Sequence, residues 1–240
     1  MIRAVFFDLD DTLCDSTTAF AAGRDAAFAT ALAATPKLTL ATLNDAWRRT
    51  HASLLPALEA GALTMARVRD VRFRRTLATA GASSDALADR LEALLGETQL
   101  RRLHRFDDVA TLDALRRRGV FVGIITNGAD DTQADSQRTK AERLGLLSEV
   151  DGFWASDSMG YRKPDPRAFA PALAAAGCAA EACLFVGDSL SADIAGANAA
   201  GLRSALLLRD AERATPGANQ PQPWRVVRSL WETLDLLDIP

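Results

Sequence analysis

The stretch Ile2-Arg-Ala-Val-Phe-Phe-Asp8-Leu-Asp10-Asp-Thr12-Leu-Cys14 determines the fold that we predict for this chain. Its apolar run from Ala4 to Phe7 is continuous, as in a strand buried on both faces, whereas a surface strand would alternate. Carboxylates follow the run at once, at Asp8 and Asp10. In open parallel α/β sheets, ligands bind at the carboxyl ends of the strands. The same residues are equally typical of an acidic turn that closes a strand, so the rest of the chain must decide between the two interpretations.

The length and composition of the chain indicate an ordinary globular protein. A chain of 240 residues fits one large domain or one domain with an insert. Its 48% hydrophobic and 25% charged content lies in the usual range for soluble proteins. The formal charge of −3 provides no basic field, so we expect neither nucleic acid nor a membrane as a partner.

The N-terminus and the cysteines indicate the cellular location. The chain enters its first strand without the charged-then-apolar layout of a signal peptide, and no run of about 18 apolar residues follows. We therefore expect a cytoplasmic protein. Cys14, Cys178 and Cys183 show no metal-ligand spacing, which argues against a disulfide framework and against a zinc site.

A long helical block follows the opening strand. Apolar residues recur at helical spacing in four successive stretches, separated by Thr35-Pro36, Gly61 and Gly81, and no strand pattern lies between them. Such a block is too long to be a loop, and it predicts a small helical domain over residues 15–104, inserted directly after the acidic strand.

From Phe106 onward the pattern alternates between strands and helices, which predicts a parallel sheet with crossover helices. The strands expected after the first are residues 120–125, 152–155, 183–186 and 204–208, and the last helix is 229–237. The fold class is therefore α/β, with a Rossmann-like core of residues 1–14 and 105–240 and a four-helix insert.

Polar residues follow three of the predicted strands, and they should meet at one edge of the sheet. Two like charges about 4 Å apart cost on the order of 4 kcal/mol at an effective dielectric constant of about 20, so several carboxylates there require a cation. Aspartate oxygens without His or Cys suit Mg²⁺, which typically keeps some waters and shares a substrate phosphate. The residues concerned are Asp8, Asp10, Thr126, Asn127, Asp188 and Asp193.

Hydrogen-bond donors and a positive charge lie near the same edge. Thr126, Asn127 and the start of the next helix offer hydroxyl and backbone N–H groups to a phosphate, and Lys163 offers a compensating charge. Each residue also has a simpler interpretation. Thr126 is typical of a helix cap, Asn127 with Gly128 of a turn, and Lys163 of the solvated surface, while Asp188 and Asp193 are typical caps for the helix that follows them.

Taken together and in order, these motifs resemble those of the haloacid dehalogenase superfamily of phosphohydrolases. The resemblance covers nearly the whole chain, and the helical insert after the first motif matches the subgroup with an α-helical cap. The matching segments are Asp8-Leu-Asp10-Asp-Thr12, Thr126-Asn127-Gly128, Lys163-Pro164, and Gly187-Asp188 with Asp193.

The resemblance implies a role for each motif residue. Asp8 would be the nucleophile that forms a phosphoaspartate, and Asp10 the general acid and base. Asp8 and Asp188 would bind Mg²⁺ through their carboxylates and Asp10 through its backbone carbonyl. Asp193, which we place with the metal site, would orient Lys163 or a metal-bound water, and the phosphoryl group would be held by Thr126, Asn127 and Lys163.

The same resemblance implies a reaction and a class of substrate. We predict a Mg²⁺-dependent phosphatase acting on a small phosphorylated metabolite, because the motif pattern is similar to that of N-acylneuraminate-9-phosphatases and pyrimidine 5′-nucleotidases, which suggests a sugar phosphate or a nucleotide monophosphate. Arg24, on the first helix of the insert, is a candidate substrate contact. The protein is expected to be a monomer or a homodimer.

Other activities are compatible with parts of the pattern. A phosphomutase would use the same aspartyl phosphate but return the group to a sugar, and a non-catalytic member would only bind a phosphorylated ligand. The 2-haloacid dehalogenases lack a carboxylate at the second Asp position of the first motif. Asp10 is present here, so phosphate chemistry is favoured over carbon–halogen cleavage.

Overall fold

A computed structural model describes residues 1–210 and 215–239 of the chain. Residues 211–214 and Pro240, which fall within the predicted core range, lie outside the described residues. Contacts divide the chain into two compact units. The first, called the sheet unit here, contains Met1–Asp15, His104–Asn127 and Ala141–Pro240; the second, the helical unit, contains Ser16–Leu103 and Gly128–Lys140.

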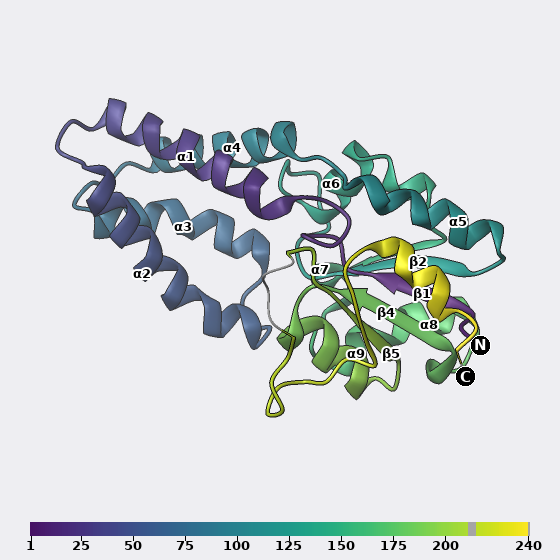
Figure 1. Cartoon of the computed structure of the whole chain (residues 1–240). Coiled ribbons are helices and arrows are strands. Elements are labelled where there is room, and N and C mark those ends of the chain that lie inside the picture. Colours follow the sequence, from purple (N-terminus) through teal and green to yellow (C-terminus); the bar gives the residue numbers. More distant parts are fainter. Residues whose placement is uncertain (211–214, 240) are drawn as a thin grey trace. The chain divides into compact units, whose positions relative to one another are not determined.

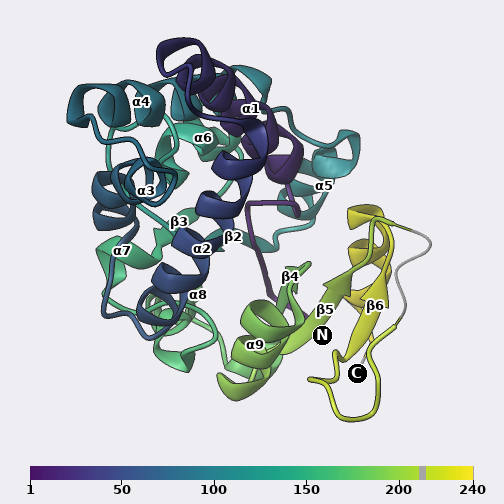
Figure 2. The same ribbon diagram turned by 90° about the vertical axis from the view of Figure 1, so that its left-hand side faces the viewer.

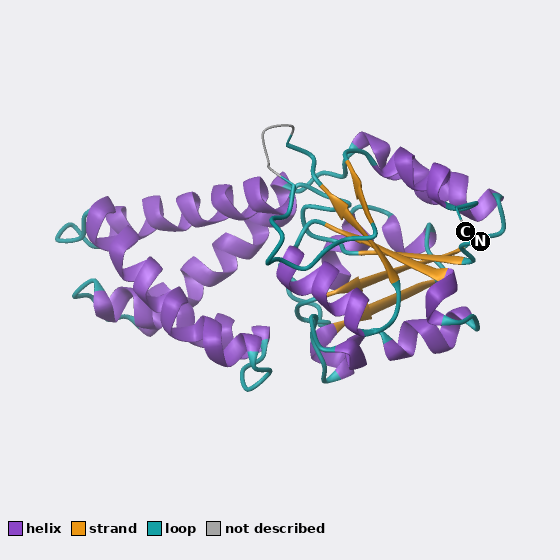
Figure 3. Cartoon of the chain, turned by 60° about the horizontal axis from the view of Figure 1, so that its bottom comes forward, coloured by secondary structure: helices purple, strands orange, loops and turns teal. Residues whose placement is uncertain are grey.

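The sheet unit is built on one parallel sheet, which Figure 3 shows in orange. In the described residues it has six strands in the order β3-β2-β1-β4-β5-β6. This confirms the predicted fold class. The strands are β1 (Ala4–Phe7), β2 (Phe121–Thr126), β3 (Gly152–Ala155), β4 (Cys183–Gly187), β5 (Arg203–Leu207) and β6 (Arg225–Val227). The edge strand β6 is absent from the prediction because three residues give too short a pattern to recognise.

The central strand β1 is buried along its whole length, as its continuous apolar run predicts. It pairs with β2 on one side and with β4 on the other, and Phe7 is in register with Ile124 and with Val186. On one face of the sheet Phe6 lies in a core cluster with Phe169 and Phe185, whose rings meet edge to face with centroids 5.2 Å apart.

Short helices connect the strands of the sheet unit (Figure 1). They are α5 (Thr111–Arg117), α6 (Gln137–Arg143), whose first residues belong to the helical unit, α7 (Ser156–Met159), α8 (Ala170–Ala176) and α9 (Ala195–Ala199). Two predicted helices differ in form. The helix expected after Asp188 opens with a π-helical turn at Leu190–Ile194 before α9, and the helix expected over 229–237 is a 3-10 helix at Leu230–Leu236.

The helical unit contains the long helices predicted from sequence, which Figure 2 shows in purple to teal. They are α1 (Ser16–Ala34), α2 (Leu40–Glu59), α3 (Met65–Thr79) and α4 (Asp85–Arg102). The side chains of Thr39, Thr64 and Ser84 cap the N-termini of the last three by accepting backbone N–H bonds.

The core of the helical unit is formed around Trp47. Its ring meets Phe28 edge to face at 5.6 Å and lies 5.2 Å from the ring of Phe73, with Leu91 and Leu95 in the same cluster. Within the described part of the chain, no helix combines the length and the apolar character needed to cross a membrane.

The helical unit also includes residues 128–140, which the sequence analysis placed in the core. This segment follows β2 directly, so a sequence pattern assigns it to the crossover of the sheet. Its contacts, described below, are with α3 and α4 instead.

Candidate active site

The polar residues that follow β1, β2 and β4 meet at one edge of the sheet because β1 lies between the other two strands. The backbone N–H of Asp8 donates to the carbonyl oxygen of Val186 at 2.9 Å, which fixes the start of the turn after β1. A pocket of about 200 Å³ opens at this edge. It is lined by Asp8, Asp10, Asp11, Thr126, Asn127, Lys163, Asp188, Ser189, Ala192 and Asp193, which include every core residue that the sequence analysis selected.

Lys163 is buried at the centre of this pocket's charges. Its ammonium nitrogen lies 2.7 Å from Asp8 Oδ1 and 2.7 Å from Asp193 Oδ1, and donates to the carbonyl oxygen of Ile125 at 2.8 Å. It also lies 4.8 Å from the centroid of the Phe185 ring. A lysine has three N–H donors, so these three acceptors fix the position of the charge. The alternative interpretation of Lys163 as a solvated surface residue is therefore wrong, because its side chain is only 2% exposed.

Asn127 holds the main chain of Lys163. Its Oδ1 accepts from the Lys163 N–H and its Nδ2 donates to the Lys163 carbonyl, both at 2.9 Å. The side-chain amide thus forms with the Lys163 backbone the pair of hydrogen bonds that a neighbouring β-strand would form. This contact is not predictable from the sequence, because nothing in the pattern links Asn127 to a residue 36 positions away.

Asp193 is buried, and both of its carboxylate oxygens contact protein groups. Oδ1 pairs with Lys163, and Oδ2 accepts from the backbone N–H of Ser189 at 3.0 Å. The carboxylate fits only because residue 187 is glycine, since a Cβ at Gly187 would lie 2.3 Å from Asp193 Oδ2. Gly187 therefore has a steric function that its place in the motif does not reveal.

Three carboxylates lie close enough to share one cation. Oxygen atoms of Asp8, Asp188 and Asp193 all lie within 4.8 Å of one another, and they form the one such acidic group found among the described residues. Carboxylate oxygens without nitrogen or sulfur ligands fit Mg²⁺. Because both oxygens of Asp193 already accept bonds from protein groups, Asp8 and Asp188 are the better placed direct ligands.

The charges in the pocket shift the pKa values of Asp8 and Lys163. Burial raises the pKa of Asp8 to about 8 against the pull of the Lys163 ammonium, and the charges of Asp193 and Asp10 add to the rise. Burial also works to lower the pKa of Lys163, but Asp193 and Asp8 outweigh it and hold that pKa above its usual value. Lys163 is therefore positive, and a divalent cation beside Asp8 would favour the ionised carboxylate.

The turn that carries Asp10 has a conformation that is uncommon for residues other than glycine. Asp11 has a φ of 58°, the single positive φ of a non-glycine residue in the described part of the chain. Its N–H donates to the carbonyl oxygen of Cys14 at 2.8 Å, which closes the turn. Asp tolerates this left-handed region better than most residues, which gives Asp11 a reason to be Asp apart from its charge.

The structure does not place Arg24 among the residues of the pocket. It lies on α1 in the helical unit, where its guanidinium donates two hydrogen bonds to Asp25 Oδ1 at 3.1 and 2.8 Å. Its predicted contact with a substrate stays a prediction.

Comparison with known proteins shows which family the chain belongs to. Residues 2–201 match the model of the haloacid dehalogenase-like hydrolase family. The chain is 32% identical to ribulose-1,5-bisphosphate 5-phosphatase of Halopiger xanaduensis, over 99% of this chain and 100% of that protein. It is 34% identical to phosphoserine phosphatase of Thermus thermophilus, over 68% of this chain and 64% of that protein. It is also 30% identical to mouse N-acylneuraminate-9-phosphatase, over 65% of this chain and 61% of that protein.

The chain also resembles solved structures in its fold. The chain resembles a putative HAD-hydrolase, YfnB, from Bacillus subtilis bound to magnesium, with a TM-score of 0.73, 26% identity and 99% of each chain covered. It resembles a 2-haloacid dehalogenase from Pseudomonas syringae equally in fold, with a TM-score of 0.73 and 27% identity over 99% of this chain and 98% of that one. The predicted resemblance to the superfamily and to its N-acylneuraminate-9-phosphatases is confirmed.

Proposed function

Because this chain is a phosphohydrolase of the haloacid dehalogenase-like hydrolase family, we propose that it uses Mg²⁺ to hydrolyse a small phosphomonoester, a sugar phosphate or a nucleotide monophosphate, through a phosphoaspartate on Asp8. One observation carries the proposal. The Asp8 carboxylate lies in the pocket with Lys163 bonded to it at 2.7 Å and with Asp188 and Asp193 grouped beside it.

The first step transfers the phosphoryl group to the enzyme. An oxygen of Asp8 attacks phosphorus, the bond from phosphorus to the substrate oxygen breaks, and the protonated carboxyl of Asp10 gives its proton to the leaving alkoxide. Lys163 offsets the negative charge of the phosphoryl oxygens. The carboxylates of Asp8 and Asp188 and the backbone carbonyl of Asp10 would hold Mg²⁺, which supplies further positive charge when bound.

The second step releases phosphate. Asp10, now ionised, takes a proton from a water molecule, the water oxygen attacks phosphorus, and the bond from phosphorus to Asp8 breaks. Thr126 and Asn127 would hold the phosphoryl oxygens through both steps, while Asp193 keeps Lys163 in place.

We propose that the two units have different functions. We assign catalysis to the sheet unit and choice of substrate to the helical unit as a cap, with Arg24 as a candidate contact to an anionic substrate. The phosphatases similar to this chain are named for phosphoserine, ribulose bisphosphate and glyceraldehyde 3-phosphate, which supports a small phosphorylated metabolite. Cytoplasmic location and a monomeric or homodimeric state stay predictions from the sequence.

Phosphate release from p-nitrophenyl phosphate and from a panel of metabolite phosphates tests the proposal. We expect activity that depends on Mg²⁺, that EDTA removes and that Asp8→Asn abolishes. Asp113→Asn, at an exposed position of α5, is the matched control and should retain full activity. Retained activity in Asp8→Asn would contradict the mechanism, and transfer of phosphate between hexose positions in the presence of a bisphosphate primer would identify a phosphomutase instead.

Similarity to the Pseudomonas syringae dehalogenase favours a second candidate, hydrolysis of a 2-haloacid. The carboxylate of Asp10 in the pocket argues against it, because the dehalogenases lack that carboxylate. Incubation with 2-chloropropionate is expected to release no chloride. Chloride release at a rate comparable to phosphate release would favour this candidate over the phosphatase.

A further inference from the structure

Residues 128–140 connect the candidate active site to the helical unit. The segment begins directly after Asn127, whose amide holds the main chain of Lys163. Its own contacts place it in the helical unit rather than in the sheet unit. The segment is therefore covalently continuous with the backbone that leaves the pocket.

Ion pairs with two buried arginines attach the segment to α3. Arg69 Nη1 lies 2.6 Å from Asp131 Oδ2, and Arg69 Nε lies 2.6 Å from Asp135 Oδ1. Arg72 Nη2 lies 3.5 Å from Asp135 Oδ2 and its Nε donates to Glu92 Oε2 on α4 at 2.8 Å. Arg72 is 2% exposed and Arg69 9%, so both arginines lie among the buried residues of the unit.

These pairs differ from the other ion pairs of α3. In the pairs of Arg67 with Asp70 and Arg74 with Asp89 both partners are more than a third exposed, and such pairs contribute little. Asp131 is 38% exposed, but the two arginines and Asp135 are at most 9% exposed. A buried arginine that loses its carboxylate is left as an uncompensated charge, which is strongly unfavourable. The segment is therefore held where Asp131 and Asp135 meet the arginines.

Packing restrains the same segment at two other points. A Cβ at Gly96 of α4 would lie 3.4 Å from the Cβ of Ala134, so the helix backbone runs close to the segment. At its C-terminal end, the buried Lys140 Nζ lies 3.5 Å from Ser16 Oγ at the start of α1. The segment is thus tied to three helices of its own unit.

We propose that Arg69 and Arg72 are positioning residues for the phosphatase reaction. Through Asp131 and Asp135 they attach residues 128–140 to α3 and α4, and so fix the backbone that carries Asn127 and, through its amide, Lys163. This inference rests on the proposed function, because it assigns the two arginines to that reaction.

Arg69→Gln in the full-length protein tests the proposal, with Arg74→Gln on the same helix as the matched control. We expect Arg69→Gln to lower kcat for p-nitrophenyl phosphate at least about tenfold with a smaller change in KM, and to speed amide hydrogen exchange in residues 128–140. Arg74→Gln should leave both measurements at the wild-type values. Arg69→Lys, which keeps the charge, should restore part of kcat and remains informative if Arg69→Gln fails to fold.

A double-mutant cycle locates the effect in the ion pair. Asp135→Asn, which removes the buried carboxylate beside Arg69, should also lower kcat, and the double variant should lose less than the two single losses combined. Faster exchange in residues 128–140 with unchanged kcat and KM would overturn the positioning role and leave the proposed function intact. A wild-type protein without phosphatase activity would overturn the proposed function, and the role of the arginines in it.

Discussion

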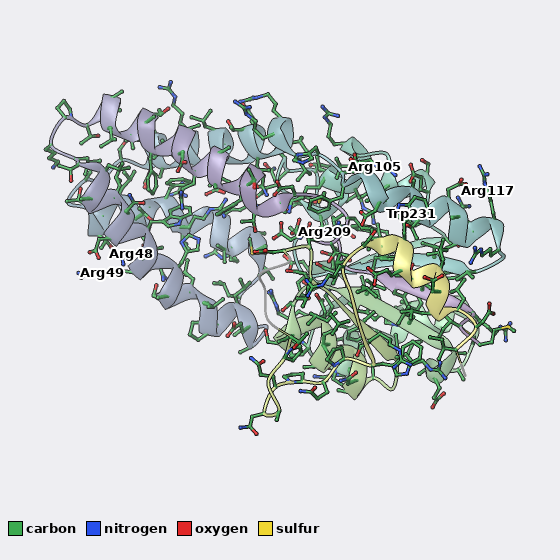
Figure 4. All side chains as sticks on the ribbon, in the orientation of Figure 1. Arg48, Arg49, Arg105, Arg117, Arg209 and Trp231 are labelled. Atoms are coloured by element: carbon green, nitrogen blue, oxygen red, sulfur yellow. The ribbon has the colours of Figure 1, made fainter. Side chains whose placement is uncertain are left out.

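At the scale of single residues, Asp108 joins three parts of the sheet unit. Its carboxylate accepts hydrogen bonds from Arg209 at 3.0 and 3.1 Å, from the backbone N–H of Leu230 at 2.8 Å and from Ser229 Oγ at 3.1 Å. Arg209 is labelled in Figure 4, and its guanidinium also covers the ring of Phe106 at 3.8 Å. One carboxylate therefore ties the 3-10 turn Asp107–Ala110, which precedes α5, to the loop after β5 and to the C-terminal 3-10 helix.

This arrangement predicts a dependence of stability on pH. Burial alone would raise the pKa of Asp108, but the hydrogen bonds from Arg209, Leu230 and Ser229 outweigh burial and hold that pKa below its usual value. The stabilisation is therefore fully present above the ordinary pKa of about 3.9 and is lost as pH falls through the depressed value. Asp108→Asn should lower the free energy of unfolding by about 2 kcal/mol at neutral pH.

Urea unfolding of wild type and Asp108→Asn between neutral and acidic pH measures this effect. The difference in free energy of unfolding should shrink as the wild-type carboxylate becomes protonated. The exposed Asp113→Asn serves as the control and should show almost no difference. A difference that does not change with pH would mean that the amide, rather than the lost charge, causes the destabilisation.

A second prediction at the residue scale concerns the reactivity of the cysteine thiols. Cys14, Cys178 and Cys183 all lie in the described residues and are free thiols. Burial, together with a hydrogen bond to Cys178, raises the pKa of the Cys183 thiol to about 12, and Cys14 is buried as well. Reactivity requires an accessible thiolate, so native protein treated with iodoacetamide should be alkylated first at the half-buried Cys178. Peptide mass mapping over time checks the order, and equal rates at Cys178 and Cys183 would contradict it.

At the scale of secondary-structure elements, Gly23 decides how closely α1 and α4 pack. A Cβ at Gly23 would lie 2.5 Å from the carbonyl oxygen of Leu95, which is helix backbone and cannot move aside cheaply. Gly23→Ala should therefore lower the free energy of unfolding by about 1–3 kcal/mol, although alanine favours the helix itself.

Gly96→Ala is the matched control for Gly23→Ala. It makes the same substitution on the partner helix α4, where the added Cβ would meet nothing closer than 3.4 Å. Chemical denaturation should show a near-neutral effect or a small gain there. Equal destabilisation by the two substitutions would mean that helix propensity or side-chain volume, rather than contact with the Leu95 carbonyl, sets the cost.

Sequence patterns predict elements well where one physical signal dominates. The continuous apolar run of β1 and the glycine and proline breaks between the long helices are such signals, and both correspond to observed elements. The π-helical turn at Leu190–Ile194 is not predictable in this way, because it brings Asp193 to Lys163 through contacts between distant residues. The clustering of motif residues was predictable because they follow the ends of neighbouring parallel strands. The two hydrogen bonds between the Asn127 amide and the Lys163 backbone were not predictable in this way.

At the scale of the whole molecule, a cation bound by the group of Asp8, Asp188 and Asp193, as we propose, would couple its binding to folding. A ligand that binds only the folded state adds about 2.7 kcal/mol of stability at a concentration of 100 times its Kd. We therefore expect the Tm to rise by several degrees as Mg²⁺ is added to protein treated with EDTA.

Asp188→Asn should abolish the Mg²⁺-dependent rise in Tm, and Asp113→Asn should leave it unchanged. Differential scanning calorimetry at fixed ionic strength separates binding at the site from screening by salt. An equal rise in wild type and Asp188→Asn would place the bound cation elsewhere.

The division of the chain into two units matters for protein engineering. The helical unit is assembled from two stretches of sequence, Ser16–Leu103 and Gly128–Lys140, with β2 encoded between them. A graft of this unit onto a related phosphatase by a single pair of crossover points would leave the second stretch behind and bring Arg69 and Arg72 against foreign partners. A functional chimera must therefore exchange both stretches together, and recombination between relatives is subject to the same constraint.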